Sequence, residues 1–386
     1  MAAPVCKSTK YTFESLDRVA DKTKYLGDAS QYDWVADGKP RTHAGNLLLT
    51  MEPGTVGTVL ASTSYVWYGK IKAVMKTSRG DGVVTAFILM SDMKDEVDYE
   101  WVGANLGTIQ TNYYFQGIPD CMYMSAQLLP DCSPHTDNNG GDTKTTDTFE
   151  DWHEYEIDWT PDTLTWSVDG QVGRVLKRSD TFNETTKRYD YPQTPSRVQL
   201  SLWPGGLATN DKGTIKWAGG VIDWENSPDI KDPGYYYATV QDVDVQCYDP
   251  PDGAKKEGSK SYSYDDLAGY EDNVVIGNKG TVLKSFLGSG TNLTATYPAT
   301  KSGTANLDGI ETVPGLTGAG TGAGSRIDED GSSGGNGNQS VTSSSGNNQF
   351  SQGDGKAGQG GAGPSVRVEH GSVLAIVIAV AAILIL

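Results

Sequence analysis

The chain has 386 residues and a formal net charge of −18, from 31 lysines and arginines against 49 aspartates and glutamates. This acidic balance argues against nucleic acid as a partner, because a phosphate backbone is attracted by positive surfaces. The hydrophobic content is 37%, and many of the 47 glycines lie near the C-terminus. We therefore expect part of the chain not to pack into a core. A neutral polysaccharide is compatible with this charge.

Residues 10–250 are predicted to be all-β. Apolar runs rich in β-branched and aromatic residues, such as Val83–Met90 and Trp152–Trp159, are separated by glycine-containing turn signals. Leu164–Val168 and Gln171–Val175 flank Asp169-Gly170, which predicts a β-hairpin. Many short strands without helical periodicity predict a two-sheet β-jelly-roll sandwich with one concave face, and residues 1–250 are taken as this domain.

Beyond residue 250 the composition changes. Residues 251–316 form a polar extension with scattered aromatic residues, and the sequence leaves open whether it packs on the domain. Residues 317–363 are rich in glycine, serine and asparagine and are expected to be a disordered stalk.

The last segment, residues 364–386, has the pattern of a glycosylphosphatidylinositol attachment signal. Small residues at 360–363 precede a polar spacer and a wholly apolar tail, Val373–Leu386. This tail is shorter than the roughly 20 residues of a transmembrane helix. Attachment within about residues 355–363 would make the protein secreted, held at the outer face of the plasma membrane or in the cell wall only by a lipid anchor. A short tail anchor is the alternative.

Four cysteines, Cys6, Cys121, Cys132 and Cys247, form no Cys-x-x-Cys pair, and the chain has only 4 histidines. We therefore expect no metal site. The cysteines indicate two disulfides in an oxidising compartment, with three possible pairings. We favour Cys121–Cys132 and Cys6–Cys247; four buried thiols are the alternative.

Three sequons, at Asn183, Asn292 and Asn338, also indicate secretion. The first residues contain no apolar stretch of signal-peptide length. The expectation is a start that is truncated or processed, which leaves open a preceding signal or further module.

The segment Asp95–Trp101 carries acids at every second position: Glu96, Asp98 and Glu100. Because strand side chains alternate between faces, the three acids should project from one side and Val97, Tyr99 and Trp101 from the other. A row of acids facing solvent suits glycosidic bond cleavage. A solvated acidic strand edge is the alternative, although the strongly apolar opposite face favours a central strand.

A retaining glycosidase needs two carboxyl groups about 5–5.5 Å apart. The Cα atoms of Glu96 and Glu100 would be about 13 Å apart on a straight strand, so the side chains must lean together on a curved one. Asp98 between them would raise the pKa of a neighbour that holds a proton and could orient the nucleophile. These considerations do not tell which glutamate is the nucleophile.

Gln199, Ser201 and Trp203 alternate along another predicted strand. They would place a hydrogen-bonding amide beside an aromatic platform, an arrangement that suits sugar binding. Core packing is the alternative for Trp203, but the Pro-Gly-Gly that follows it makes that alternative less attractive.

Several segments resemble the fungal Crh-type branch of glycoside hydrolase family 16, over most of residues 10–290. They are Asp95–Gly103, Gln110–Phe115, Arg197–Gly205, Gly213–Trp224 and Gly280–Phe286. The C-terminal anchor signal is typical of that branch too. The loop from Cys121 to Cys132 is longer than expected.

The resemblance implies a concanavalin-like β-jelly roll and a retaining mechanism without cofactors. Glu96 would be the nucleophile, Asp98 its helper and Glu100 the acid/base. Gln199, Trp203 and Thr214 would contact the donor sugar together with Glu100. The implied reaction cleaves chitin and transfers the chain to β-1,3- or β-1,6-glucan, which cross-links the fungal cell wall.

Two other functions remain open from the sequence. One is hydrolysis, as an endo-β-glucanase or chitinase of the same fold; aromatic acceptor subsites, with Tyr113 and Tyr114 as candidates, would favour transfer by excluding water. The other is a non-catalytic wall carbohydrate-binding protein, which would have no need for three aligned acids. A monomer is expected. Linkage preference, the ratio of hydrolysis to transfer, the anchor attachment residue and the disulfide pairing stay open.

Overall fold

The computed structural model describes residues 2–118 and 139–296. These residues form two large, mainly antiparallel sheets of eight strands each. The first sheet has the spatial order β12 (Gly141–Lys144), β11 (Thr108–Tyr114), β10 (Glu96–Val102), β9 (Val83–Ser91), β18 (Ser196–Pro204), β7 (Thr58–Val66), β4 (Trp34–Asp37), β3 (Val19–Asp21). The second has β15 (Gln171–Lys177), β14 (Thr163–Val168), β13 (His153–Trp159), β8 (Gly69–Lys76), β19 (Tyr236–Cys247), β6 (Asn46–Met51), β5 (Arg41–His43), with β2 (Thr9–Thr12) paired to β19.

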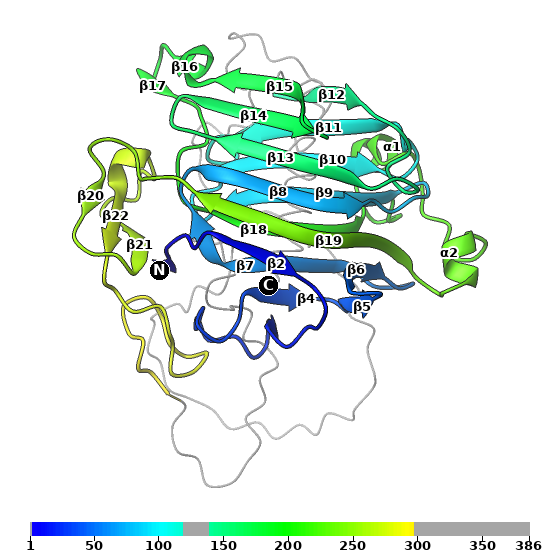
Figure 1. Ribbon diagram of the computed structural model, residues 1–386, viewed down its shortest axis with the longest axis horizontal. Coiled ribbons are helices and arrows are strands. Elements are labelled where there is room, and N and C mark those ends of the chain that lie inside the picture. Colours follow the sequence, from blue (N-terminus) through cyan, green and yellow to red (C-terminus); the bar gives the residue numbers. More distant parts are fainter. Residues whose placement is uncertain (1, 119–138, 297–386) are drawn as a thin grey trace, which may run out of the picture. The chain divides into compact units, whose positions relative to one another are not determined.

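The two sheets pack face to face around one apolar core (Figure 1). Alternating residues of the first sheet, such as Phe87 and Tyr99, join Ile71 and Ile157 of the second sheet in a single buried cluster. The Tyr99 hydroxyl donates to the Ser167 carbonyl across the sheets at 2.9 Å. The predicted all-β sandwich is therefore confirmed.

The predicted hairpin is present. β14 and β15 pair with Val168 opposite Gln171, so Asp169 and Gly170 form a two-residue turn. Both residues have positive φ, 50° for Asp169 and 74° for Gly170, as the turns that match strand twist require.

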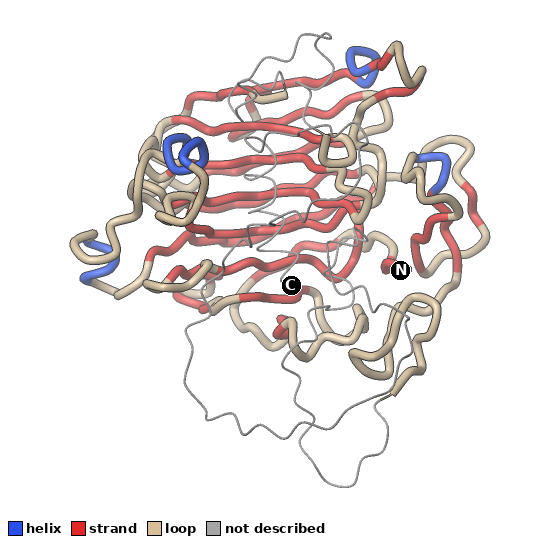
Figure 2. The backbone as a smooth tube through the Cα atoms, turned by 180° about the vertical axis from the view of Figure 1, so that it is seen from behind, coloured by secondary structure: helices blue, strands red, loops and turns tan. Residues whose placement is uncertain are grey.

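In the described part of the chain, helices are few and short, and Figure 2 shows them at the margins of the sheets. They are α1 (Lys212–Trp217), α2 (Pro228–Lys231) and the 3-10 turns η2 (Arg178–Thr181) and η3 (Glu271–Asn273). A small hairpin, β16 (Phe182–Asn183) with β17 (Arg188–Tyr189), follows η2. The N-cap of α1 is Asp211, whose carboxylate accepts from the backbone N–H groups of Gly213 and Thr214. This N-cap explains a helix in a β-rich region.

Residues 251–296, the described part of the polar extension, pack on the sandwich. Its strands β20 (Lys255–Lys256), β21 (Ser261–Tyr264) and β22 (Val274–Gly277) form a four-stranded sheet with β1 (Ala3–Pro4). Tyr262, Val274 and Ile276 enter the main core cluster. The segment thus shares its hydrophobic core with the two large sheets.

Cys6 and Cys247 are joined by a disulfide with a Cα–Cα distance of 6.0 Å, which confirms one favoured pair. Cys121, Cys132, Asn338, the stalk and the anchor signal lie outside the described residues. Within residues 2–118 and 139–296, no helix has the length and apolar character needed to cross a membrane.

Candidate active site

Strand β10 carries the three acids in the middle of the first sheet. It pairs with β9 on one side and β11 on the other, so Asp98 lies opposite Ile88 and Asn112. Directly opposed residues share a sheet face. Glu96 and Glu100, two positions away on either side, therefore share the face of Asp98, as the sequence predicts.

The other face of β10 belongs to the core. Val97, Tyr99 and Trp101 are buried there, and the Trp101 ring meets Tyr155 of the second sheet with 4.5 Å between centroids. This aromatic contact fixes which face of β10 is turned inward. The acids consequently point away from the second sheet.

The face of the first sheet that carries Glu96, Asp98 and Glu100 is called the acid face. Strand β18 brings Gln199, Ser201 and Trp203 to it. Gln199 pairs with Ile88, which in turn pairs with Asp98. Likewise, Ser201 pairs with Ala86, which in turn pairs with Glu100. Two strand spacings place β18 about 10 Å from β10. The amide and the aromatic ring therefore lie beside the acid row, at a separation that suits one sugar unit.

The amide of Gln199 is buried without a partner. The side chain is 1% exposed, and neither Oε1 nor Nε2 has a hydrogen bond. Leaving a buried polar group unpaired costs about 1–3 kcal/mol. Such a group on the acid face is suited to a polar ligand, and this observation supports the predicted sugar contact.

Trp203 lies outside the main core. It packs with Val84, Ala218 and Trp217 in a small cluster of its own, and its ring stacks on Trp217 at 5.8 Å between centroids. Its Nε1 is buried without a hydrogen bond. The Trp203 side chain is 1% exposed, so its ring is packed among these residues, and a contact with the donor sugar stays a prediction.

Thr214 occupies the first turn of α1 and is fully buried. Its hydroxyl donates to the Asp211 carboxylate at 2.8 Å. The side chain thus takes part in helix capping, a structural role that the sequence did not predict. A contact between Thr214 and the donor sugar stays a prediction.

The neighbouring strand β11 adds polar groups to this face, and the sequence interpretation overlooked two of them, Gln110 and Asn112. Gln110, Asn112 and Tyr114 lie opposite Glu100, Asp98 and Glu96. Their alternation at every second position was the available signal. Tyr113, by contrast, lies opposite Val97 and joins the core cluster. Of the two tyrosines suggested for an acceptor subsite, only Tyr114 shares the acid face.

Burial shapes the electrostatics of the acid row. It raises the pKa of Glu96 to about 7, while a hydrogen bond with Asp98 lowers it. Two carboxyl groups can share such a bond only when one of them holds a proton, so they titrate as a pair. Glu100 is less buried than either. In this row, Glu96 and Asp98 are therefore linked by a hydrogen bond, and Glu100 at the other end is more accessible to solvent.

Asp95 anchors the start of the acid strand. Its carboxylate accepts from the Thr194 hydroxyl at 2.6 Å and from the backbone N–H groups of Gln116, Gln193 and Thr194. Burial raises its pKa to about 6, against these hydrogen bonds. The contacts tie β10 to the segment that leads into β18, which holds the two sides of the site together.

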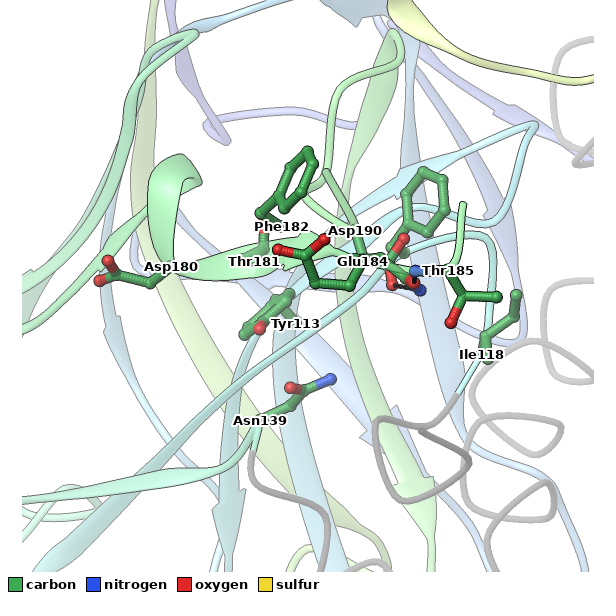
Figure 3. Close-up of a pocket in the computed structure, with 11 residues that line it drawn as sticks. Tyr113, Ile118, Asn139, Asp180, Thr181, Phe182, Glu184, Thr185 and Asp190 are labelled. Atoms are coloured by element: carbon green, nitrogen blue, oxygen red, sulfur yellow. Dashed lines mark hydrogen bonds between the residues drawn. The ribbon is translucent and has the colours of Figure 1, made fainter. Parts of the chain in front are cut away.

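A pocket of about 290 Å³ lies elsewhere, between the end of β11 and the β16–β17 hairpin. Figure 3 shows Tyr113, Asp180, Phe182 and Asp190 around it, and none of the three acids lines it. The predicted glycosylation residue Asn183 is in its wall, with Nδ2 donating to Asp190 at 2.8 Å. Asn292, in comparison, is exposed.

Within residues 2–118 and 139–296, no group of three or more His, Cys, Asp or Glu side chains is arranged to hold a metal ion. The chemistry of the acid face can be derived from carboxyl groups alone, since two of them suffice for glycoside cleavage.

Comparisons with known proteins identify relatives of this chain. The family model of glycosyl hydrolases family 16 matches residues 28–219. Crh-like protein 2 of Aspergillus fumigatus is 54% identical over 78% of the chain and 65% of its own length. Crh-like protein 3 of Botryotinia fuckeliana is 51% identical over 82% and 67%. The chain thus spans about two thirds of the length of these relatives.

Among solved structures, the Crh5 transglycosylase in complex with NAG is similar, with a TM-score of 0.55 and 29% identity. The match covers 72% of this chain and 96% of that one. The chain belongs to glycosyl hydrolase family 16, in the group of fungal Crh-like proteins.

Proposed function

We propose that the chain is a retaining transglycosylase of the fungal cell wall. Glu96 attacks the anomeric carbon, Glu100 protonates the leaving oxygen and later deprotonates the acceptor hydroxyl, and Asp98 orients Glu96 through their hydrogen bond. The observation that carries this proposal is the shared face of the three acids in a central strand. Two carboxyl groups on one face are the catalytic requirement of retaining glycosidases.

The proposed donor is chitin and the proposed acceptor is β-1,3- or β-1,6-glucan. The donor is supported by the Crh5 transglycosylase, a similar protein whose solved structure contains NAG. On this chain, the unpaired amide of Gln199 and the ring of Trp203 would hold the donor sugar. Transfer rather than hydrolysis requires that the acceptor displace water at the glycosyl-enzyme; Tyr114 beside Glu96 is placed to help.

Localisation follows the same proposal. The protein acts as a monomer outside the cell, attached through a lipid anchor after removal of residues 364–386, and carries glycans at its sequons. Asn292 is the most accessible of the sequon residues for which the structure gives a position.

Product analysis tests the reaction. Fluorescently labelled β-1,3- and β-1,6-glucan oligosaccharides are incubated with chitin and the protein. The expected product is a hybrid chain that carries the label and is sensitive to both chitinase and glucanase. Free chito-oligosaccharides without any hybrid would identify a hydrolase instead. Absence of both products, with binding to either polysaccharide retained, would identify a non-catalytic binding protein.

The roles of the two glutamates are assigned by azide rescue. Glu100→Ala is expected to lose about 10²–10⁴-fold in rate, the usual contribution of general acid catalysis. On a dinitrophenyl glycoside, whose leaving group departs without protonation, azide should raise the turnover of this variant and give a glycosyl azide of retained configuration, because the nucleophile is still present. Glu96→Ala with azide should give the inverted product. If Glu96→Ala gave the retained product and Glu100→Ala the inverted one, Glu100 would be the nucleophile and Glu96 the acid/base.

A further inference from the structure

Trp217 sets the orientation of the Gln110 side chain. Its indole Nε1 donates to Oε1 of Gln110, with 2.7 Å between the two atoms. An indole nitrogen is a donor only, so its partner must be the oxygen end of the amide. Nε2 of Gln110, which carries two N–H donors, is therefore the end of the amide that does not face the indole.

On strand β10, the acidic neighbour of Gln110 is Glu100. The two residues lie directly opposite each other in the β10–β11 ladder. Their Cβ atoms are then about 4.5–5.5 Å apart, within hydrogen-bonding reach for two long side chains. On the other side of Gln110 stands Asp142 of β12, which is exposed. On the far side of Glu100 stands Ala86, which offers no polar side chain.

The indole that makes this contact is itself held in place. Its ring stacks on Trp203 with 23° between the planes. α1, which ends at Trp217, is capped by the Asp211 carboxylate. The nitrogen of Trp217 is therefore a fixed donor, and it can select one of the two amide orientations of Gln110.

We propose that Trp217 is a positioning residue for the proton transfer by Glu100, acting through Gln110. By accepting from Trp217, Oε1 of Gln110 directs Nε2 at the Glu100 carboxyl group. When the glycosidic C–O bond breaks, the proton of Glu100 passes to the leaving oxygen and Glu100 becomes a carboxylate. The N–H groups of Gln110 stabilise that developing charge more than the neutral acid. This inference rests on the role of Glu100 in the proposed function.

The test compares two donors that differ in their need for an acid. One is an unactivated chito-oligosaccharide. The other is the dinitrophenyl glycoside of the same sugar, whose leaving group departs without protonation. Trp217→Phe keeps an aromatic ring against Trp203 but removes the N–H. Its kcat/KM should fall about threefold to tenfold on the first donor, the equivalent of one hydrogen bond. On the second donor it should change less than twofold.

Two further variants separate positioning from packing. Gln110→Glu can still accept from Trp217 but has no N–H to donate, so its loss on the unactivated donor should at least equal that of Trp217→Phe. The double variant Trp217→Phe with Gln110→Leu should lose no more than Gln110→Leu alone. Trp152→Phe, at a partly exposed tryptophan that lies under Lys76, is the matched control and should leave both donors unaffected.

Equal losses on both donors would overturn the inference, because Trp217 would then act by touching the sugar. Multiplicative losses in the double variant, or no loss in Trp217→Phe, would overturn it as well. Glu100→Gln distinguishes failure of the inference from failure of the proposed function. If this variant loses only the unactivated donor while Trp217→Phe loses neither, Glu100 is the acid and the positioning role alone is wrong. If Glu100→Gln is as active as the unchanged protein on both donors, the proposed function fails.

Discussion

The indole Nε1 of Trp166, in the second sheet, donates a hydrogen bond to the backbone carbonyl of Asp98 at 3.0 Å. Asp98 is the central acid of the site, so this bond ties the acid strand to the sheet behind it. The Trp166 side chain is fully buried.

Replacement of Trp166 should therefore affect both stability and catalysis. Trp166→Phe removes this hydrogen bond to the Asp98 carbonyl, and we expect the free energy of unfolding to fall by about 2–4 kcal/mol from the lost bond and the cavity. A small shift of Asp98 should lower kcat/KM by roughly tenfold, since catalysis is sensitive to displacements of an ångström. Urea denaturation and steady-state kinetics measure the two effects.

Trp159→Phe is the matched control. Trp159 is equally buried, and its Nε1 also donates to a backbone carbonyl, that of Pro192, at 3.0 Å. It should lose similar stability without the kinetic effect. If both variants lose the same activity, the bond to Asp98 has no particular role in the site.

The unpaired amide of Gln199 should lower the stability of the free protein. Because both polar atoms of its buried amide are unpaired, Gln199→Leu should leave the stability of the free protein unchanged or raise it by about 1 kcal/mol. The same variant should raise KM for the chitin donor. Gln193→Leu is the contrast, since the buried Gln193 amide donates to the carbonyls of Tyr189 and Tyr191.

Thermal unfolding of both glutamine variants provides the measurement. Gln193→Leu should destabilise the protein by about 1–3 kcal/mol, because two carbonyls lose their partner. A Gln199→Leu variant that is destabilised as much would show that its amide has partners in the folded protein.

Stability and activity should depend on pH in opposite directions through Glu96. Burial raises the folded-state pKa of Glu96 to about 7, above its unfolded value of 4.5. The folded protein therefore holds this proton more tightly. The resulting stability is fully present below pH 4.5 and is lost as pH rises toward 7, by up to about 1.4 kcal/mol per pH unit. Activity needs ionised Glu96, so kcat/KM should fall as pH drops below about 7.

Glu96→Gln isolates this contribution. The amide does not titrate, so the unfolding free energy of the variant should depend less on pH between 4.5 and 7 than that of the unchanged protein. At neutral pH the variant should also be the more stable of the two. Identical pH profiles of unfolding would show that Glu96 has an ordinary pKa in the folded state.

The Cys6–Cys247 disulfide spans 241 residues of sequence, nearly the whole described chain. Closing so long a loop restricts the unfolded state, and its removal should cost about 5 kcal/mol in the chain-entropy estimate. Cys6→Ser with Cys247→Ser should therefore lower the midpoint of urea unfolding. A reductant should lower the midpoint of the unchanged protein toward that of the double variant. Equal midpoints for all three samples would contradict this account.

Much of the site could be predicted because strand side chains follow a period of two. That rule was enough to put Glu96, Asp98 and Glu100 on one face and Tyr99 and Trp101 on the other. The same rule separates Tyr113 from Tyr114, but its application to them needed the register between β10 and β11. The stacked pair of Trp203 and Trp217 and the cap at Thr214 depend on the path of α1.

The sequence by itself determined the fold class, the hairpin at Asp169-Gly170 and the shared face of the acids, because these follow from local alternation and turn chemistry. Only the tertiary structure decided that Gln199 stands two strands from Asp98, that Gln110 faces Glu100, and that residues 251–296 contribute to the core. These relations join residues far apart in the chain. They are set by strand order and register, which depend on the packing of both sheets and on no single segment.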